Sequence, residues 1–182
     1  MKKLAFAATA LAMIAGTPAV LSARQAMPAP SASMSPEMTP TAAMPFVMMA
    51  GASDLYEIQS SRMALSKART PAVRQYAQMM ITHHTKTTRD VTTAARRAGM
   101  KPTKPKLTAM QADMIAQLRS AGAGADFERT YLTQQLQSHE MALALHTNYA
   151  QNGDTPQLKT AAQGAVPIVQ QHLDRVRGMQ NM

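Results

Sequence analysis

From residue 71 onward, apolar side chains recur in alternating steps of four and three residues, which is the spacing of one face of an α-helix. Three long segments carry such a face, and each face contains a histidine near the middle of its segment. Faces of this kind pack against one another in the core of a helix bundle. Their members are Val73, Ala77, Met80, His84, Thr87, Val91, Ala94 and Ala98, then Leu132, Leu136, His139, Leu143, His146 and Ala150, then Leu158, Ala161, Ala165, Ile168, His172, Val176 and Met179.

Capping and helix-breaking residues set the expected limits of the helices. Ser53 and Asp126 are suitable N-cap residues, and the Thr-Pro pairs at 70–71 and 155–156 each place proline in a first helical turn. A first helix with Glu57 at the border of its apolar face precedes the three regular ones, and a short helix separates the second long helix from the third. We expect helices over residues 53–69, 71–98, 108–120, 126–152 and 156–182.

The lengths of the connections predict how these helices are joined. The first and second long helices, and likewise the third and fourth, are separated by only a few residues, so each pair forms an antiparallel hairpin. The predicted fold class is therefore all-α: a ferritin-like four-helix bundle over residues 51–182, with a long crossover that carries the short extra helix. A simple up-and-down bundle with an elaborate loop is the alternative.

The first fifty residues differ from the rest of the chain. Lys2 and Lys3 precede an apolar stretch broken by Gly16 and Pro18, which is typical of a secretory signal peptide, expected over residues 1–23. A retained anchor is the rival interpretation, but the stretch is short for a membrane span. Residues 24–50 are rich in Ala, Pro, Ser and Met and are expected to form a disordered tether. We therefore expect an exported protein, periplasmic or secreted, with no integral membrane segment once the signal is removed.

Composition narrows the chemistry that the chain can perform. The absence of cysteine excludes disulfides and thiolate metal sites. The formal net charge is +9, yet the basic residues are scattered along helix exteriors, and the cluster at Lys101, Lys104 and Lys106 has no interleaved aromatic residue. A solvated basic surface is thus favoured over a nucleic-acid partner. Protein partners and oligomeric state cannot be inferred from these features.

The histidines of the helix faces are the candidate functional residues. His84, His139 and His172 lie near the midpoints of their helices, and Glu57 lies somewhat before the midpoint of the first, so all four can reach one layer. Buried imidazoles need hydrogen bonds or a metal ion, and these residue types would suit zinc, copper or iron. The alternative is a structural hydrogen-bond network of these groups with Tyr76 or Tyr131, tying the helices into register.

Other arrangements of the same residues are less favourable. A di-iron centre uses Glu-x-x-His pairs, but Ile81 and Val169 stand three residues before His84 and His172. His83 is expected to face a neighbour or solvent, and His146 lies two turns from His139, too far to share one metal. Methionines of the tether could bind Cu(I), although their irregular spacing favours a compositional bias. No catalytic residue is predicted, which favours a binding protein over an enzyme.

Several short motifs together give the chain a family resemblance. It resembles an uncharacterised ferritin-like family of exported bacterial proteins, often labelled predicted outer-membrane proteins, over about Ala50 to Arg177. The family pattern has Asp where His83 stands and Asp where Glu128 stands. The resemblance implies the fold and the export but no activity. The matching positions are Glu57, then His83-His84-Thr85, then Phe127-Glu128 and Tyr131 leading to His139, then Pro167 leading to His172-Leu173.

Two functional hypotheses follow from the sequence. The first is an exported protein that binds a transition metal through Glu57, His84, His139 and His172. The second is a non-catalytic envelope or stress-related interaction protein in which the same side chains form only a structural network. The two differ in whether a metal ion occupies the layer.

Overall fold

The computed structural model describes residues 39–180, and these residues form five helices and no strand. The expectations for a signal peptide and for residues 24–38 of the tether lie outside the described residues. The all-helical bundle predicted from the hydrophobic pattern is confirmed. In chain order, the helices are α1 (Ala43–Lys67), α2 (Pro71–Arg97), α3 (Ala109–Ser120), α4 (Ala125–Asn152) and α5 (Pro156–Gln180).

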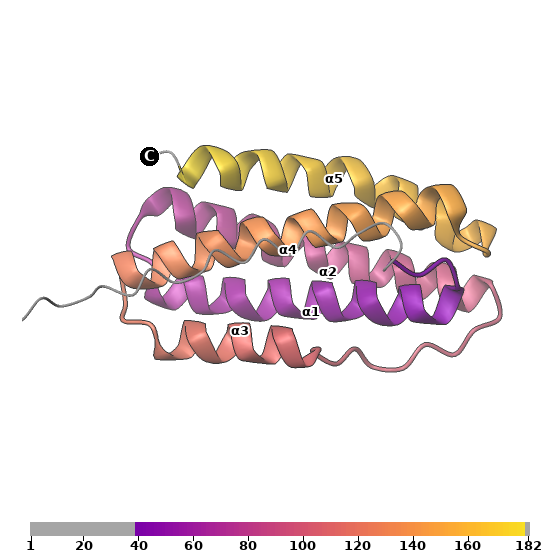
Figure 1. Cartoon of the computed structure of the whole chain (residues 1–182), viewed down its shortest axis with the longest axis horizontal. Helices are drawn as coiled ribbons and strands as arrows, with labels where there is room; N and C mark the ends of the chain where they lie inside the picture. The colour runs from indigo at the N-terminus through magenta and orange to yellow at the C-terminus, as the bar shows by residue number, and fades with distance from the viewer. Residues whose placement is uncertain (1–38, 181–182) are drawn as a thin grey trace, which may run out of the picture. The chain divides into compact units, whose positions relative to one another are not determined.

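The four long helices pack as two hairpins, α1 with α2 and α4 with α5, which contact each other through α2 with α5 and α1 with α4. The connection after α2 returns the chain along the bundle, with α3 lying beside α1, so that α2 and α4 run in the same direction (Figure 1). Two backbone hydrogen bonds fix the ends: Gly124 N–H donates to the Lys67 carbonyl at 2.9 Å, and Asp154 N–H to the Thr41 carbonyl at 3.0 Å.

The largest difference from the sequence-based expectation concerns the start of α1. It begins at Ala43 rather than Ser53, so residues 43–50, expected to belong to the tether, are helical. The reason is tertiary packing. Phe46 is fully buried and stacks on Tyr149 with ring centroids 3.9 Å apart, and Val47 is buried in the same cluster. Apolar burial of this kind stabilises a helix end that has no side-chain cap of its own.

Two further details of α3 and α4 test the capping predictions. Thr108 forms the predicted start of α3 through a capping box with Gln111. In α4 the N-cap is Gly124, with φ of 88°, and Asp126 lies within the first turn instead of capping it. Glycine suits this position because a positive φ is strained for other residues.

The buried face of α4 is displaced from the predicted stripe. Leu132, Leu136 and Leu143 are only partly buried, whereas Gln135 and Tyr149 are fully buried. The cause is that α4 packs against α1 and α3 as well as α5, so the face that points into the core does not follow the predicted stripe.

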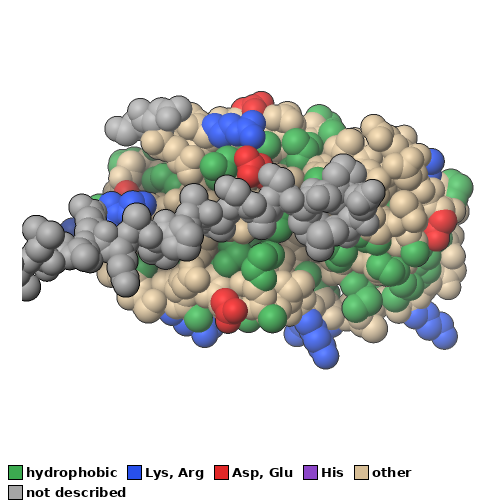
Figure 2. All heavy atoms as spheres, in the orientation of Figure 1, with side chains coloured by type: hydrophobic (Ala, Val, Ile, Leu, Met, Phe, Trp, Pro, Cys, Tyr) green, Lys and Arg blue, Asp and Glu red, His purple; other side chains and the backbone are tan. Residues whose placement is uncertain are grey.

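Charged side chains are dispersed over the surface. On the face shown in Figure 2, Lys and Arg stand singly among other side chains, and the described residues of that face show no histidine. Within residues 39–180, no helix combines the length and apolar character needed to cross a membrane.

The two hairpins are joined by Glu128, which gives a test of the fold. Its Oε1 accepts hydrogen bonds from the backbone N–H groups of Arg69 and Thr70 at 2.6 and 2.8 Å, and its Oε2 accepts from the Thr70 hydroxyl at 2.7 Å. Because these bonds satisfy free N–H groups at the start of α2, Glu128→Ala should lower the free energy of unfolding by about 1–2 kcal/mol in urea titrations. Glu140→Ala, which breaks only an exposed pair with Arg177, should cost about 0–1 kcal/mol, and equal losses would contradict the capping role.

Candidate metal centre

Three imidazoles from three helices meet in the middle of the bundle. His84 of α2, His139 of α4 and His172 of α5 each offer one ring nitrogen, and these nitrogens all lie within 4.8 Å of one another. The ring centroids form a nearly equilateral triangle with sides of 5.2, 5.3 and 5.6 Å. The three residues are 3, 1 and 0% exposed. The structure therefore brings together the three histidines singled out by the periodicity.

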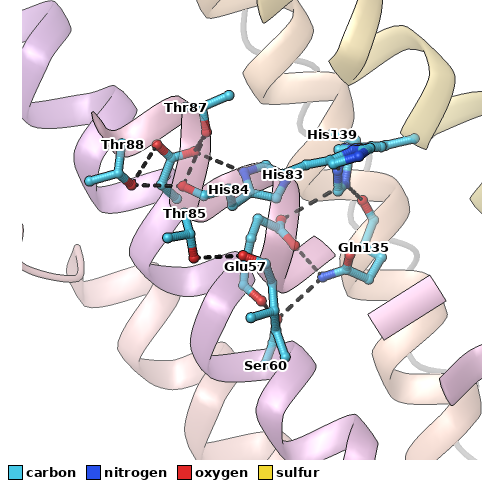
Figure 3. A network of polar contacts seen from close by, with 12 residues as sticks. Glu57, Ser60, His83, His84, Thr85, Thr87, Thr88, Gln135 and His139 are labelled. Atoms are coloured by element: carbon cyan, nitrogen blue, oxygen red, sulfur yellow. Dashed lines mark hydrogen bonds and ion pairs between the residues drawn. The ribbon is translucent and has the colours of Figure 1, made fainter. Parts of the chain in front are cut away.

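His84 is oriented by a buried carboxylate on α1. Its Nδ1 donates a hydrogen bond to Asp54 Oδ1 at 2.8 Å, and the hydroxyls of Thr87 and Thr88 donate to the two oxygens of the same carboxylate (Figure 3). With Nδ1 engaged in this way, the Nε2 atom of His84 is buried and has no hydrogen-bond partner. A buried polar atom without a partner is costly, so this nitrogen requires an explanation.

The other two rings are held by groups behind them. His139 Nδ1 donates to the carbonyl oxygen of Gln135 at 2.8 Å, which leaves Nε2 facing His172 Nδ1 at 3.2 Å. The outer nitrogen of His172 lies 2.7 Å from His83 Nδ1, and the His83 and His172 rings are stacked with centroids 5.0 Å apart. Hydrogen bonds of this kind to the outer nitrogen fix the tautomer and orientation of a metal-ligating imidazole.

Glu57 lies next to the three histidines but is not among the residues whose ligand atoms converge. It is 1% exposed, and its Oε2 accepts a hydrogen bond from Gln135 Nε2 at 2.6 Å. Its Oε1 lies 3.8 Å from the Nδ1 atom of His139, on the side of the ring away from His172, and has no hydrogen bond. In this arrangement Glu57 lies beside the Nδ1 atom of His139 without a hydrogen bond to it.

A layer of neutral polar side chains adjoins Glu57. The Tyr56 hydroxyl donates to Gln134 Oε1 at 2.9 Å, and the Ser61 and Tyr131 hydroxyls are 2.8 Å apart. Tyr76 is fully buried without a hydrogen bond to its hydroxyl, although its ring lies 6.5 Å from that of His139. The expected links from Tyr76 and Tyr131 to the histidines are therefore not hydrogen bonds in this structure.

Burial and neighbouring charges shift the pKa values of these groups in different directions. Burial lowers the pKa of His139 to about 3 and that of His172 to about 2, with the neighbouring His84 charge adding to the effect. Burial also opposes the charged form of His84, but the hydrogen bond and charge of Asp54, together with Glu57, raise its pKa above the usual value. Burial raises the pKa of Glu57 to about 7 against the opposing effect of His84. Two of the three imidazoles are thus neutral at neutral pH, as metal ligation requires.

Two residues of this site were not identified as site residues from the sequence. Asp54 was overlooked because the predicted helix start at Ser53 placed it in a first turn, whereas it lies near the middle of α1 and is 4% exposed. His83 was expected to face a neighbour or solvent, and the neighbour that it contacts is His172. Its position next to His84 is the only sequence signal for this role.

His146 lies away from the centre, as expected from its distance to His139. It is buried, and its ring meets that of Phe46 edge-on with centroids 5.6 Å apart. Its Nδ1 has no hydrogen bond, and burial lowers its pKa to about 4. His146 therefore belongs to the apolar end of the core and serves as a natural reference for a buried histidine outside the centre.

The fold and the site define an all-helical bundle with a buried three-histidine centre, and comparison with known proteins adds a family. The chain matches the domain of unknown function DUF4142 over residues 27–179 and belongs to that family. The expectation of an uncharacterised family is confirmed to this extent. None of the curated proteins compared with the chain matches it.

Solved structures with the same fold have little sequence in common with the chain. The Cu(II)-bound form of CopM is 18% identical, with a TM-score of 0.64, and the similarity covers 77% of this chain and 97% of that one. The Ag-bound form of CopM gives a TM-score of 0.63 at the same identity, covering 77% and 96%. A DUF305 fragment from Deinococcus radiodurans, also 18% identical, gives 0.65 and covers 78% and 95%. At this identity, the similarity concerns the fold.

The buried histidines predict that stability falls on acidification. Because the unfolded chain protonates histidine near pH 6.5 and the folded state keeps His139, His146 and His172 neutral, their contribution is present above pH 6.5 and is lost as the pH falls toward their lowered pKa values. Glu57 and His84, whose pKa values are raised, act in the opposite sense: Glu57 loses its contribution as the pH rises through 7, and His84 loses its contribution as the pH rises through its raised pKa. The three lowered histidines outnumber these two groups, so chelator-treated protein should become less stable from pH 7 to pH 5.

Urea unfolding across this pH range tests the prediction. In His146→Gln, the free energy of unfolding should decline less steeply with falling pH, by up to about 1.4 kcal/mol per pH unit. This is the slope that one proton contributes when the unfolded chain binds it and the folded chain does not. Glu57→Gln should make the decline steeper, because it removes the opposing contribution. A stability profile that does not change with pH in all three proteins would mean that these groups titrate as if exposed.

Proposed function

We propose that the protein binds one transition-metal ion, copper, through His84, His139 and His172, and that it holds this ion rather than catalysing a reaction. The observation that carries the proposal is His84 Nε2, a buried nitrogen without a hydrogen bond that belongs to a group of three converging imidazoles. A cation bound by this lone pair would satisfy it together with the other two.

The spacing of the nitrogens supports this proposal. Ligands 2.0–2.1 Å from a tetrahedral ion are separated by about 3.3–3.4 Å, given typical metal–imidazole distances. His139 Nε2 and His172 Nδ1 are already 3.2 Å apart, and His84 offers a ring nitrogen within 4.8 Å of a ring nitrogen of each of the other two. The outer nitrogens are engaged by Asp54, Gln135 and His83, as is usual for histidine ligands.

The choice of copper rests on the donor set and on the similar structures. Imidazole suits zinc, copper, iron and nickel, and among the divalent ions affinity for such a site is highest for copper. CopM, whose fold is similar, has been solved in Cu(I)-bound, Cu(II)-bound and Ag-bound forms. Glu57 lies outside the proposed ligand set because its carboxylate faces the outer nitrogen of His139.

Burial of the centre favours binding over catalysis. The three ligand residues are at most 3% exposed, so an ion among them has no open approach for a substrate on the described residues. We further propose that the bundle is of the ferritin-like type. The parallel course of α2 and α4, and the long connection between them, support this assignment over an up-and-down bundle.

Metal binding by untagged protein tests the proposal. The wild type should bind one equivalent of Cu(II), show nitrogen hyperfine coupling in its electron paramagnetic resonance spectrum and gain about 2.7 kcal/mol of stability at a free metal concentration of 100 times Kd. His84→Gln and His139→Gln should abolish this binding. Asp54→Asn, which disturbs only the orientation of His84, should weaken it 10–100-fold.

His146→Gln is the matched control, since it removes an equally buried histidine from α4 without touching the centre. It should retain full copper binding. A wild-type protein that is isolated metal-free, and whose melting temperature does not respond to copper, zinc or iron, would rule out the metal centre. The histidines would then act as the structural network of an interaction protein.

We also propose that the protein is exported, on the basis of the positive start and apolar stretch of residues 1–23. Mass spectrometry of protein from a periplasmic extract should find a mature chain that begins after Ala19 or Ala23. An intact chain that remains in the cytoplasmic fraction would contradict the export.

A further inference from the structure

A second group of potential metal ligands lies on the surface, where α1, α3 and α4 meet. A small pocket of 80 Å³ is lined by residues of these three helices (for α1 and α3, see Figure 1). One methionine from each helix takes part: Met49 of α1, Met110 of α3 and Met141 of α4. Three methionines from separate helices thus line one cavity.

The remaining lining of the pocket offers no competing metal ligand. It contains no carboxylate and no imidazole among the described residues. Two of its polar side chains, Thr108 and Gln111, are engaged with each other's backbone in the capping box of α3. The thioether sulfurs are therefore the strongest metal donors of the pocket, and a hard divalent cation has nothing there to neutralise its charge.

Core packing does not account for all three methionines. Methionine commonly fills irregular gaps in a core, and Met49 and Met141 are partly covered. Met110, however, is 42% exposed, while Met114 and Leu118 of the same helix already fill the core side of α3. The pocket is also far below the volume of about 300–1,000 Å³ that organic ligands occupy, and its size suits a single ion.

We propose that Met49, Met110 and Met141 form a binding site for a soft monovalent cation, Cu(I) or Ag(I). Soft thioether ligands select such ions over zinc, magnesium or calcium. Met141 is about 200° around α4 from His139, by helical geometry, so this site and the histidine centre lie on different faces of the helix. The site is thus independent of the histidine centre and does not depend on the function proposed above.

Methionine methyl spectra provide a direct test in the full chain, with Ag(I) as a probe that does not change its oxidation state. The signals of Met49, Met110 and Met141 can be assigned with single Met→Leu variants, which are close in volume and keep the fold. One equivalent of Ag(I) should shift all three signals together. In Met110→Leu, the shifts of Met49 and Met141 should be lost or need at least tenfold more Ag(I).

Met48→Leu is the matched control, because Met48 is an exposed methionine of α1 that does not line this pocket. It should leave the three shifts unchanged, and so should His84→Gln, which separates the result from that of the histidine centre. The proposal is overturned if Ag(I) leaves the three signals in place, or if Met49 and Met141 respond equally well in Met110→Leu.

Discussion

The structure depends on one constraint: each imidazole buried in the bundle needs partners for two ring nitrogens. Asp54, Gln135 and His83 provide partners for the outer nitrogens of His84, His139 and His172. The bond from Asp54 joins α1 to α2, the contact of His83 joins α2 to α5, and the 3.2 Å contact between His139 and His172 joins α4 to α5. The layer therefore fixes the heights of all four long helices relative to one another. A shift of any helix by one turn, about 5.4 Å, would break these bonds.

The same constraint explains why α1 is long. Asp54 can meet His84 only if it lies inside the bundle, and a buried carboxylate there requires donors, which His84, Thr87 and Thr88 provide. Residues 43–50 extend α1 beyond Asp54 and bury Phe46 against Tyr149. This apolar contact closes the end of the core. Asp54 thus lies in the middle of α1 because the packing of Phe46 extends the helix beyond it.

Most of the fold and the three histidines of the site could be predicted from the sequence, because the spacing of apolar residues along a helix is a local property. The steps of three and four residues placed His84, His139 and His172 on core faces at similar heights, and the structure brings them together. The start of α1 could not be predicted, since it depends on contacts between Phe46 and residues a hundred positions away. Asp54 was missed for the same reason, and the stacking of His83 on His172 depends on the neighbouring helix.

A count of protons indicates what the centre is suited to hold. A neutral imidazole carries one ring proton. When His84 is neutral, its proton and that of His139 lie on Nδ1, directed at Asp54 and at the Gln135 carbonyl, and the single proton of His172 can serve either His139 or His83. In this state the three nitrogens that face one another share at most one proton, and their lone pairs repel. A cation placed among these nitrogens would be attracted by their lone pairs. The groups that bind the outer ring nitrogens therefore also orient the three inner nitrogens toward a space that favours a positive charge.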